Sequence, residues 1–295
     1  MTSVSIGICA FNEESNITKI LDSILNQNLD RVEIIEIIVI SSASTDSTDR
    51  LVMEYSDKDS RVRLITEETR KGKASAVNLF LKLAKGEICV IQSADTISTP
   101  NTIEEICKPI IDDDKIGAVG GRPIPIKGPN FLINSFSSMI WELHSRVSRK
   151  QPKLGEISAH RNVIEQIPSH AIADDAYLEF LIRDMGLETS YSHEAVIYNS
   201  GPDSLSEYIQ QRVRWRASQI RLNHETGHIS ASGKQNLVNL ELALLCLKKP
   251  WKIPIALPLC LIELHCIRAA KKSLASNEDE FIIWDSIDST KKVND

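Results

Sequence analysis

The sequence predicts an α/β protein in which a mostly parallel central sheet is flanked by helices. Through the first hundred residues, short apolar runs alternate with segments whose apolar residues recur at helical spacing. Strands separated by such helices need crossover connections, which make neighbouring strands parallel. Each apolar run also ends in a polar segment, and in a parallel sheet those segments meet along one edge. We therefore expect the side chains that follow the strands to form one site.

The first half of the chain supplies four predicted strands with three helices between them. The strands cover residues 4–10, 33–40, 62–65 and 88–96. The first helix carries Ile17, Leu21 and Ile24 on one face, and the later helices carry Val52 and Val77 in the same way. Each helix can therefore cover the sheet with an apolar face.

The strand at residues 88–96 (ICVIQSADT) is the one around which the chain is organised. Four apolar or sulfur-bearing residues begin it, so it reads as a buried parallel strand, and Asp95 lies at its carboxyl end. A carboxylate at that edge can hold a divalent cation against a phosphate. The alternative is that Asp95 caps a turn before Pro100.

The second half continues the alternation. It predicts strands at residues 117–125 and 155–161, and helices at 131–147, 177–185 and 206–221. Within the 117–125 segment the strand is expected to give way to a loop, because its second part is rich in Pro and Gly. Asp174 and Asp175 come just before the 177–185 helix, where acids can simply cap the helix and interact with its dipole.

Composition narrows the class of protein. The 295 residues are 42% hydrophobic and 25% charged, which is ordinary for a soluble globular protein of one α/β domain with appendages. The net charge of -6 argues against a nucleic-acid partner, because phosphate contacts need clustered Lys and Arg. The six cysteines form no CxxC pair, and the N-terminus lacks the basic start of a secretory signal, so we expect reduced thiols and a cytoplasmic protein.

Three side chains at the predicted sheet edge suit a nucleotide. Phe11 can stack on a base, Lys73 can neutralise a phosphate, and Asp95 can hold a metal that bridges a diphosphate. Taken singly, Phe11 can be a packing residue and Lys73 a solvated loop charge. Their convergence favours a ligand site.

The order and spacing of several stretches resemble a known family. AFNEE, STD, RKGKASAVN and SAD occur in the first half, and ADD and the QxxRW set of Gln211, Arg214 and Trp215 follow in the second. Over residues 4–221 these stretches resemble the family-2 glycosyltransferases. The resemblance implies a GT-A fold at residues 1–225, in which a Rossmann-like nucleotide-sugar-binding half (1–100) is joined to an acceptor half (101–225).

The resemblance also implies a role for each matching residue. Asp175 falls on the position of the general base, and Asp95 on that of the metal ligand, with Mn²⁺ or Mg²⁺ as the cofactor. The implied donor-binding residues are Phe11, Glu13, Ser42, Lys73, Ser93, Asp95 and Arg214. The implied acceptor-side residues are Asp174, Gln211 and Trp215. The implied reaction is inverting transfer of a hexosyl group from a nucleotide-diphosphate sugar to a hydroxyl of a glycan or lipid-linked acceptor.

Two serines depart from the family pattern. Family members commonly carry Asp-Asp-Gly-Ser where this chain has residues 41–44, and Asp-x-Asp where it has residues 93–95. Ser42 and Ser93 therefore replace acids that usually contact the base and the ribose. Serine hydroxyls still donate and accept hydrogen bonds, but they carry no charge.

Three alternatives stay open from the sequence. The Arg-rich helix at residues 206–221 can be a solvated basic face. A nucleotidyltransferase can use a related sheet, although such enzymes favour a Gly-rich basic loop after the first strand, where this chain has AFNEE. A catalytically inactive scaffold subunit would explain the serine replacements, but it has no need to keep Asp95, Asp175 and the QxxRW set.

The C-terminal part is predicted to be an apolar helical segment at residues 226–275 and a polar tail at 276–295. The two apolar runs, 237–247 and 253–266, each fall short of the about 20 residues that a membrane span needs. Trp251 and the lysines between them suit a headgroup interface. We expect this segment to meet the inner face of the cell membrane, a homodimer partner or the core. For the tail, with its apolar island at 281–284, two alternatives stay open: it docks back on the body or it is partly disordered.

Overall fold

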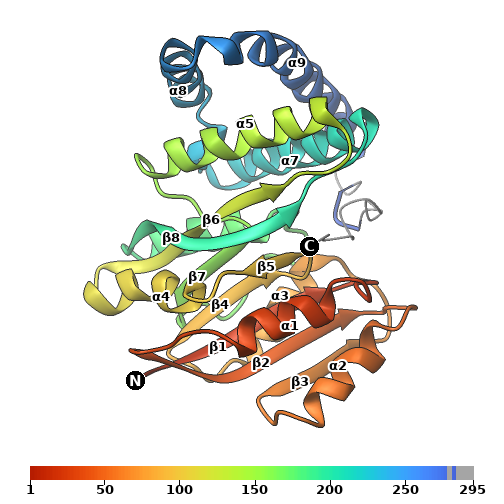
Figure 1. Ribbon diagram of the computed structural model, residues 1–295, viewed down its shortest axis with the longest axis vertical. Coiled ribbons are helices and arrows are strands. Elements are labelled where there is room, and N and C mark those ends of the chain that lie inside the picture. Colours follow the sequence, from red (N-terminus) through yellow and green to blue (C-terminus); the bar gives the residue numbers. More distant parts are fainter. Residues whose placement is uncertain (278–280, 284–295) are drawn as a thin grey trace.

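The computed structural model describes residues 1–277 and 281–283 and contains one eight-stranded sheet (Figure 1). The strand order is β3-β2-β1-β4-β7-β6-β8-β5. The strands are β1 (Thr2–Ala10), β2 (Val32–Ser42), β3 (Val62–Glu67), β4 (Ile88–Ser93), β5 (Thr96–Ser98), β6 (Ile116–Ile126), β7 (Ile157–Arg161) and β8 (Glu188–Ser200). The predicted α/β class with a mostly parallel sheet is confirmed.

The two halves of the sheet differ in strand direction. β1 to β4 pair in parallel, as the crossover argument requires. β7 then runs antiparallel to both β4 and β6, while β6 and β8 are parallel. The carboxyl ends of β1, β2 and β4 therefore share one edge, and β7 enters at that edge from the opposite direction.

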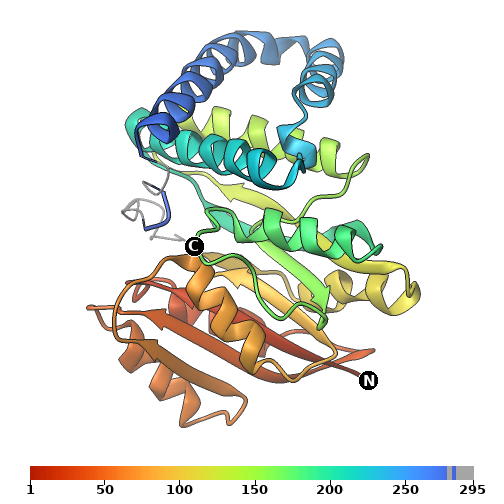
Figure 2. The same cartoon turned by 180° about the vertical axis from the view of Figure 1, so that it is seen from behind.

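Helices cover both faces of the sheet (Figures 1 and 2). One face carries α1 (Ile17–Leu25), α2 (Thr48–Ser56) and α4 (Thr102–Asp112), and the other carries α3 (Lys73–Leu83) and α6 (Asp174–Asp184). Phe80 of α3 is fully buried against Gly7 of β1, where an added Cβ would lie 2.5 Å from the ring. Gly7 thus lets α3 pack directly on the strand, and truncating a buried Phe typically costs about 3–5 kcal/mol.

A third layer of helices stands beyond the sheet edge, at the top of Figure 1. It consists of α5 (Phe131–Ser148), α7 (Leu205–Thr226), α8 (Gln235–Lys248) and α9 (Ile253–Ser276), with short 3₁₀ turns η1 (Ala231–Gly233) and η2 (Pro250–Lys252). Phe136, Tyr208, Leu245 and Leu259 form its separate core. The C-terminal helical extension expected from the sequence is therefore present.

Two local expectations were wrong. The predicted Pro- and Gly-rich loop is the last part of β6, which continues through Pro123 and Pro125 because its partner β8 pairs with it to Ser200. The second apolar run, 253–266, is also part of a longer helical stretch than its length suggests, because η2 and α9 together cover Pro250–Ser276. Pro254 lies in the first turn, where no backbone donor is needed, so it does not stop the helix.

By length and composition, Pro250–Ser276 is the one helix in the described part of the chain that could cross a membrane. It has 27 residues, and 22% of its most apolar stretch is buried within the protein. Glu263 in its middle is paired with two arginines of α7, so the helix lies along the body of the protein. Length alone therefore does not define its relation to a membrane.

Candidate functional site

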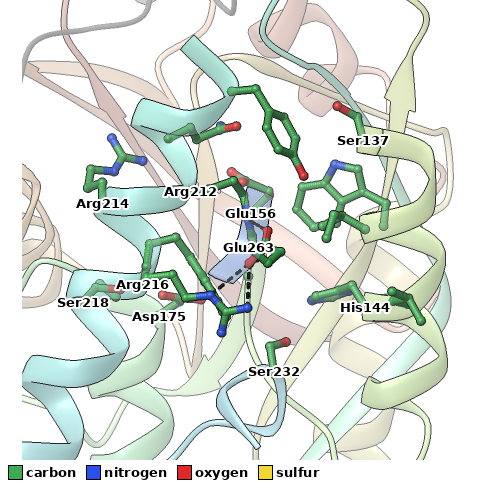
Figure 3. Close-up of a pocket in the computed structure, with 18 of the residues that line it drawn as sticks. Ser137, His144, Glu156, Asp175, Arg212, Arg214, Arg216, Ser218, Ser232 and Glu263 are labelled. Carbon is green, nitrogen blue, oxygen red and sulfur yellow. Dashed lines mark hydrogen bonds and ion pairs between the residues drawn. The ribbon is translucent and has the colours of Figure 1, made fainter. Parts of the chain in front are cut away.

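A cavity of about 960 Å³ opens where the carboxyl ends of β1, β2 and β4 face α5, α6 and α7 (Figure 3). Every site residue predicted from the sequence lines it. These residues are Phe11, Glu13, Ser42, Lys73, Ser93, Asp95, Asp174, Asp175, Gln211, Arg214 and Trp215. The cavity thus brings together side chains that are as far as two hundred residues apart in the chain.

Hydrogen bonds join the loop after β1 to the loop after β2. Asn12 has a φ of 53°, a left-handed conformation that Asn tolerates better than most residues. Its side-chain oxygen accepts a hydrogen bond from the Thr45 backbone N–H at 2.7 Å, and its own N–H donates to the Ser44 hydroxyl at 3.1 Å. These bonds fix the position of Phe11 and Glu13 at the cavity edge.

Phe11 is stacked against a cation. The guanidinium carbon of Arg70 lies 3.9 Å from the centroid of the Phe11 ring. Contacts of this kind are favourable because the face of an aromatic ring has a negative electrostatic potential that attracts a cation. Phe11 and Arg70 therefore form a flat, aromatic and cationic wall, and Arg70 carried no role in the sequence interpretation.

The side chain of Ser42 is hydrogen-bonded to a buried acid, Glu67. Its hydroxyl donates to Glu67 Oε2 at 2.7 Å, and Ser75 donates to the other carboxylate oxygen at 2.6 Å. Glu67 is buried at the end of β3. A negative charge is thus present next to the position where the family pattern has an acid and this chain has a serine. Only the β2–β3 pairing, which places Ser42 opposite Glu67, could have revealed it.

The loop before α3 needs its glycine. Gly72 has a φ of +91°, and an added Cβ would lie 2.5 Å from the carbonyl oxygen of Ile282. The tail residues at 281–283 therefore lie against this loop, which agrees with the docking alternative for the island at 281–284, although residue 284 is outside the described residues. Ile282 and Ile283 also line the cavity.

Lys73, which follows Gly72, faces the acid pair of α6. Its Nζ lies 3.1 Å from Asp174 Oδ1. Burial alone lowers the pKa of Lys73, but the surrounding carboxylates, Asp174 foremost, outweigh burial and hold the pKa above its usual value. Lys73 is therefore a permanent cation beside Asp174 and Asp175.

Asp95 faces a second carboxylate. Burial raises its pKa to about 6, Glu156 adds to the shift, and Lys73 and Arg214 oppose it. Ser93 Oγ donates to Glu156 Oε2 at 2.9 Å, because β7 pairs with β4 and brings the residue before it alongside Ser93. Glu156 lay within a segment that the sequence interpretation read only as a strand.

The groups around Asp95 fit a divalent cation by their chemistry. Asp95, Glu156 and the Ser93 hydroxyl offer the hard oxygen ligands that Mg²⁺ and Mn²⁺ prefer. Among residues 1–277 and 281–283, no group of three or more His, Cys, Asp or Glu forms a complete metal site. A cation at Asp95 would therefore take further ligands from a bound substrate or water.

Asp175 is a half-buried acid in the first turn of α6, next to the buried Asp174. Burial raises its pKa, Lys153 opposes the shift, and Asp174 adds to it. Lys153 was not identified from the sequence; its backbone approaches so closely that a Cβ on Gly120 would meet its carbonyl oxygen at 2.1 Å. The sequence offered no periodic signal for Lys153, because it lies in an irregular segment before β7.

Three arginines of α7 near the cavity fall into two groups (Figure 3). Arg212 and Arg216 pair with Glu263 of α9, each at 2.6 Å, and are only 14% and 10% exposed. They also lie 4.5 and 4.9 Å from the Trp215 ring. Burial lowers the pKa of Arg214 to about 10, with Glu156, Asp95 and Asp174 opposing. The solvated basic face is therefore ruled out for these three arginines.

Comparison with known proteins identifies the family. Residues 5–180, more than half of the chain, match the sequence profile described as Glycosyl transferase family 2. The chain belongs to this family. The match spans the parallel half of the sheet, the acid pair and the start of α6, and ends before α7.

Curated relatives of this family 2 member have low sequence identity to it but align with most of the chain. A probable glycosyltransferase, YdaM of Bacillus subtilis, is 25% identical over 230 residues, covering 73% of this chain and 54% of the relative. A poly-beta-1,6-N-acetyl-D-glucosamine synthase of Staphylococcus epidermidis is 23% identical over 224 residues, covering 72% and 53%. The chain therefore spans about half the length of these relatives.

A solved structure confirms the fold. The mannosyltransferase PcManGT from Pyrobaculum calidifontis, determined in complex with GDP-Man and Mn²⁺, superposes with a TM-score of 0.62 at 24% identity, covering 93% of this chain and 75% of the other. This family 2 chain has the GT-A fold that its motifs predict.

Proposed function

We propose that the protein is an inverting, metal-dependent glycosyltransferase that moves a hexosyl group from a nucleotide-diphosphate sugar to a hydroxyl acceptor. One observation carries the proposal: a single cavity holds two partly buried acids with raised pKa, Asp95 and Asp175, together with the cations Lys73 and Arg214. Such a pairing can take up a proton at one place and stabilise a leaving diphosphate at another.

Asp175 is the base in this proposal. The acceptor oxygen forms a bond to the anomeric carbon of the sugar while the bond from that carbon to the diphosphate breaks. The acceptor's proton goes to Asp175, and the electron pair leaves with the nucleoside diphosphate. A carboxylate whose pKa is raised by burial takes this proton more readily than an exposed one, and Asp174 contributes by adding to the shift.

The diphosphate lies between Lys73, Arg214 and Asp95. Arg214 suits it because a guanidinium donates two parallel hydrogen bonds, and Lys73 supplies a fixed positive charge. A divalent cation held by Asp95, with Glu156 and Ser93 beside it, would neutralise charge that develops on the leaving diphosphate. The complex of the Pyrobaculum mannosyltransferase with GDP-Man and Mn²⁺ supports a divalent cation, of which Mn²⁺ and Mg²⁺ are the candidates.

The nucleoside and acceptor occupy opposite sides of the site. The Phe11 and Arg70 wall stacks on the base, and Glu13 and the Ser42–Glu67 pair bind the base and ribose edges. Gln211 and Trp215 face the acceptor, at i and i+4 on α7. The name of the Staphylococcus relative, a poly-beta-1,6-N-acetyl-D-glucosamine synthase, supports a glycan as the acceptor. We propose a surface or lipid-linked glycan, with transfer at the cytoplasmic face of the membrane.

Calorimetric titration with nucleoside diphosphates and nucleotide sugars, with and without Mn²⁺ or Mg²⁺, tests the proposal. We expect metal-dependent binding of one nucleotide sugar, followed by its turnover when acceptors are added. Absence of binding across the panel, in a protein shown to be folded by circular dichroism, would overturn the proposal. That outcome would favour the inactive scaffold and give the serines at 42 and 93 the central role.

A further inference from the structure

The cavity that holds Asp175 has a second, apolar end. Beyond Trp215 its walls are made by α5, α8 and α9, which do not contribute to the donor loops. The apolar side chains that line this end include Ile140, Leu143, Val147, Leu242, Ala256 and Leu259. One cavity therefore joins acids and cations at one end to hydrocarbon side chains at the other.

The apolar end reaches the surface on α9. Ile253, Leu257 and Leu264 line the cavity and are also 43%, 65% and 50% exposed. They recur at helical spacing along one stripe, which also contains the exposed Leu261. The mouth of the cavity is therefore bordered by an exposed apolar surface, and large exposed apolar surfaces mark binding sites.

The chemistry around that stripe favours a membrane. Farther along α9 the same stripe carries the exposed Arg268 and Lys271, and the exposed Lys248 and Trp251 lie at the end of α8 and in η2. An apolar helix face flanked by basic residues and Trp is typical of helices that lie in the headgroup region of a bilayer. A second copy of the chain docked there would instead close the mouth and offer no hydrocarbon phase from which a ligand could enter.

The junction between the two ends is polar and fixed. Arg212 and Arg216 converge on Glu263, which holds α9 against α7 beside Trp215 (Figure 3). A hydrocarbon chain would meet these charges at the junction, so an occupant of the whole cavity needs an apolar part and a polar head. Neither a free sugar nor a soluble glycan has both.

We propose that the apolar end of the cavity binds the hydrocarbon chain of a membrane-resident acceptor, entering from a bilayer on which the exposed stripe of α9 rests, so that the polar head of the acceptor reaches Asp175. This inference rests on the proposed glycosyltransferase function and names the class of its acceptor: a lipid with a hydroxyl-bearing head.

Binding of octyl, decyl and dodecyl β-glucosides below their micelle concentrations tests the apolar end. Because burial of a methylene contributes about 0.8 kcal/mol, affinity should rise about fourfold for each added methylene until the chain outgrows the cavity. Ala243→Trp, at an exposed helical position that lines the cavity, should abolish this dependence by filling the space. Leu242→Trp is a second filling variant. Nucleotide binding at the donor end reports that each variant is folded.

Co-sedimentation with vesicles tests the membrane contact. The wild-type chain should bind phosphatidylcholine vesicles that contain phosphatidylglycerol, and Leu257→Asp with Leu261→Asp should weaken this binding about tenfold or more. Met53→Asp is the matched control, since Met53 is a similarly exposed apolar residue on the distant α2, at 57% against 65% for Leu257 and 69% for Leu261.

Each failure has a distinct meaning. Suppose that the protein still binds nucleotide, but its affinity for the glucosides does not depend on alkyl length or is unchanged by Ala243→Trp. That result would overturn this inference and leave the proposed function standing. So would conversion of a dimer to a monomer by Leu257→Asp with Leu261→Asp without loss of vesicle binding, because the stripe would then be a contact between copies. Loss of nucleotide binding in the wild-type chain would instead overturn the proposed function.

Discussion

The ammonium group of Lys73 lies 3.1 Å from the carboxylate of Asp174, and this ion pair joins the first turn of α3 to the first turn of α6. A cation at a helix N-terminus interacts unfavourably with the dipole of that helix. Lys73 is at the N-terminus of α3, where the acids at the N-terminus of α6 offset this unfavourable interaction. The arrangement concentrates positive charge where the proposed diphosphate lies. It also places that charge next to the proposed base.

Lys73→Met should weaken nucleotide binding about tenfold or more, because a charge-assisted contact to phosphate is lost. It should also raise the pKa of Asp175 further, since Lys73 opposes the upward shift. The measurement is calorimetric titration with the donor nucleotide, together with the pH dependence of transfer. Lys73→Arg is the control and should keep most of the affinity. Unchanged binding in the Met variant would show that Lys73 serves only to neutralise Asp174.

Asp175→Asn should lower the transfer rate by about 10²–10⁴-fold, the usual contribution of a positioned base, while donor binding stays intact. The same change should raise the melting temperature at neutral pH. The folded-state pKa of Asp175 lies above its unfolded value, so its charged form is a cost to folding at neutral pH and that cost disappears at low pH. Rate and thermal melting are measured on one preparation. Normal transfer would exclude Asp175 as the base.

Metal-dependent donor binding should fade as the pH falls through about 6, the pKa of Asp95, because a protonated carboxyl is a poor ligand for a cation. Asp95 is charged above that pH and neutral below it, so metal binding should be lost as the pH is lowered and kept as it is raised. Titrations of Mn²⁺ with the nucleotide across this range provide the test. In Asp95→Asn the metal dependence should be weak at every pH, and a normal pH profile in that variant would assign the titration to another group.

Sequence reasoning located the fold and the predicted lining residues for one physical reason. Apolar runs such as residues 88–91 and helical spacing fix the elements, and parallel strands bring their carboxyl ends together whatever the loops contain. Phe11, Lys73 and Asp95 reach one cavity because each follows such an element. The distance between these residues along the chain does not predict that they share a cavity, but the topology of the sheet does.

Other charged residues in and next to the cavity escaped prediction because only pairing or packing places them. Glu67 reaches Ser42 through the β2–β3 register, and Glu156 reaches Ser93 through an antiparallel strand that the crossover argument did not foresee. Lys153 lies in an irregular segment with no periodicity. The pairing of α9 with α7 through Glu263 was likewise invisible, because a lone acid in an apolar run gives no hint of its partner.

Glu263 should be one of the costliest single residues to remove from the C-terminal layer. It is 12% exposed and neutralises Arg212 and Arg216, so Glu263→Ala leaves two buried guanidinium groups without their partner. Breaking a buried ion pair in this way costs about 3–5 kcal/mol. The free energy of unfolding, from denaturant titration, is the measurement. Glu142→Ala is the matched control: Glu142 pairs with Lys249 and Lys252 and is 29% exposed, against 12% for Glu263, so water can replace more of the lost interaction and the loss should be smaller. If both variants lose equally little, Glu263 does not fix α9 against α7, and the polar junction of the cavity is held by the apolar packing of the helices alone.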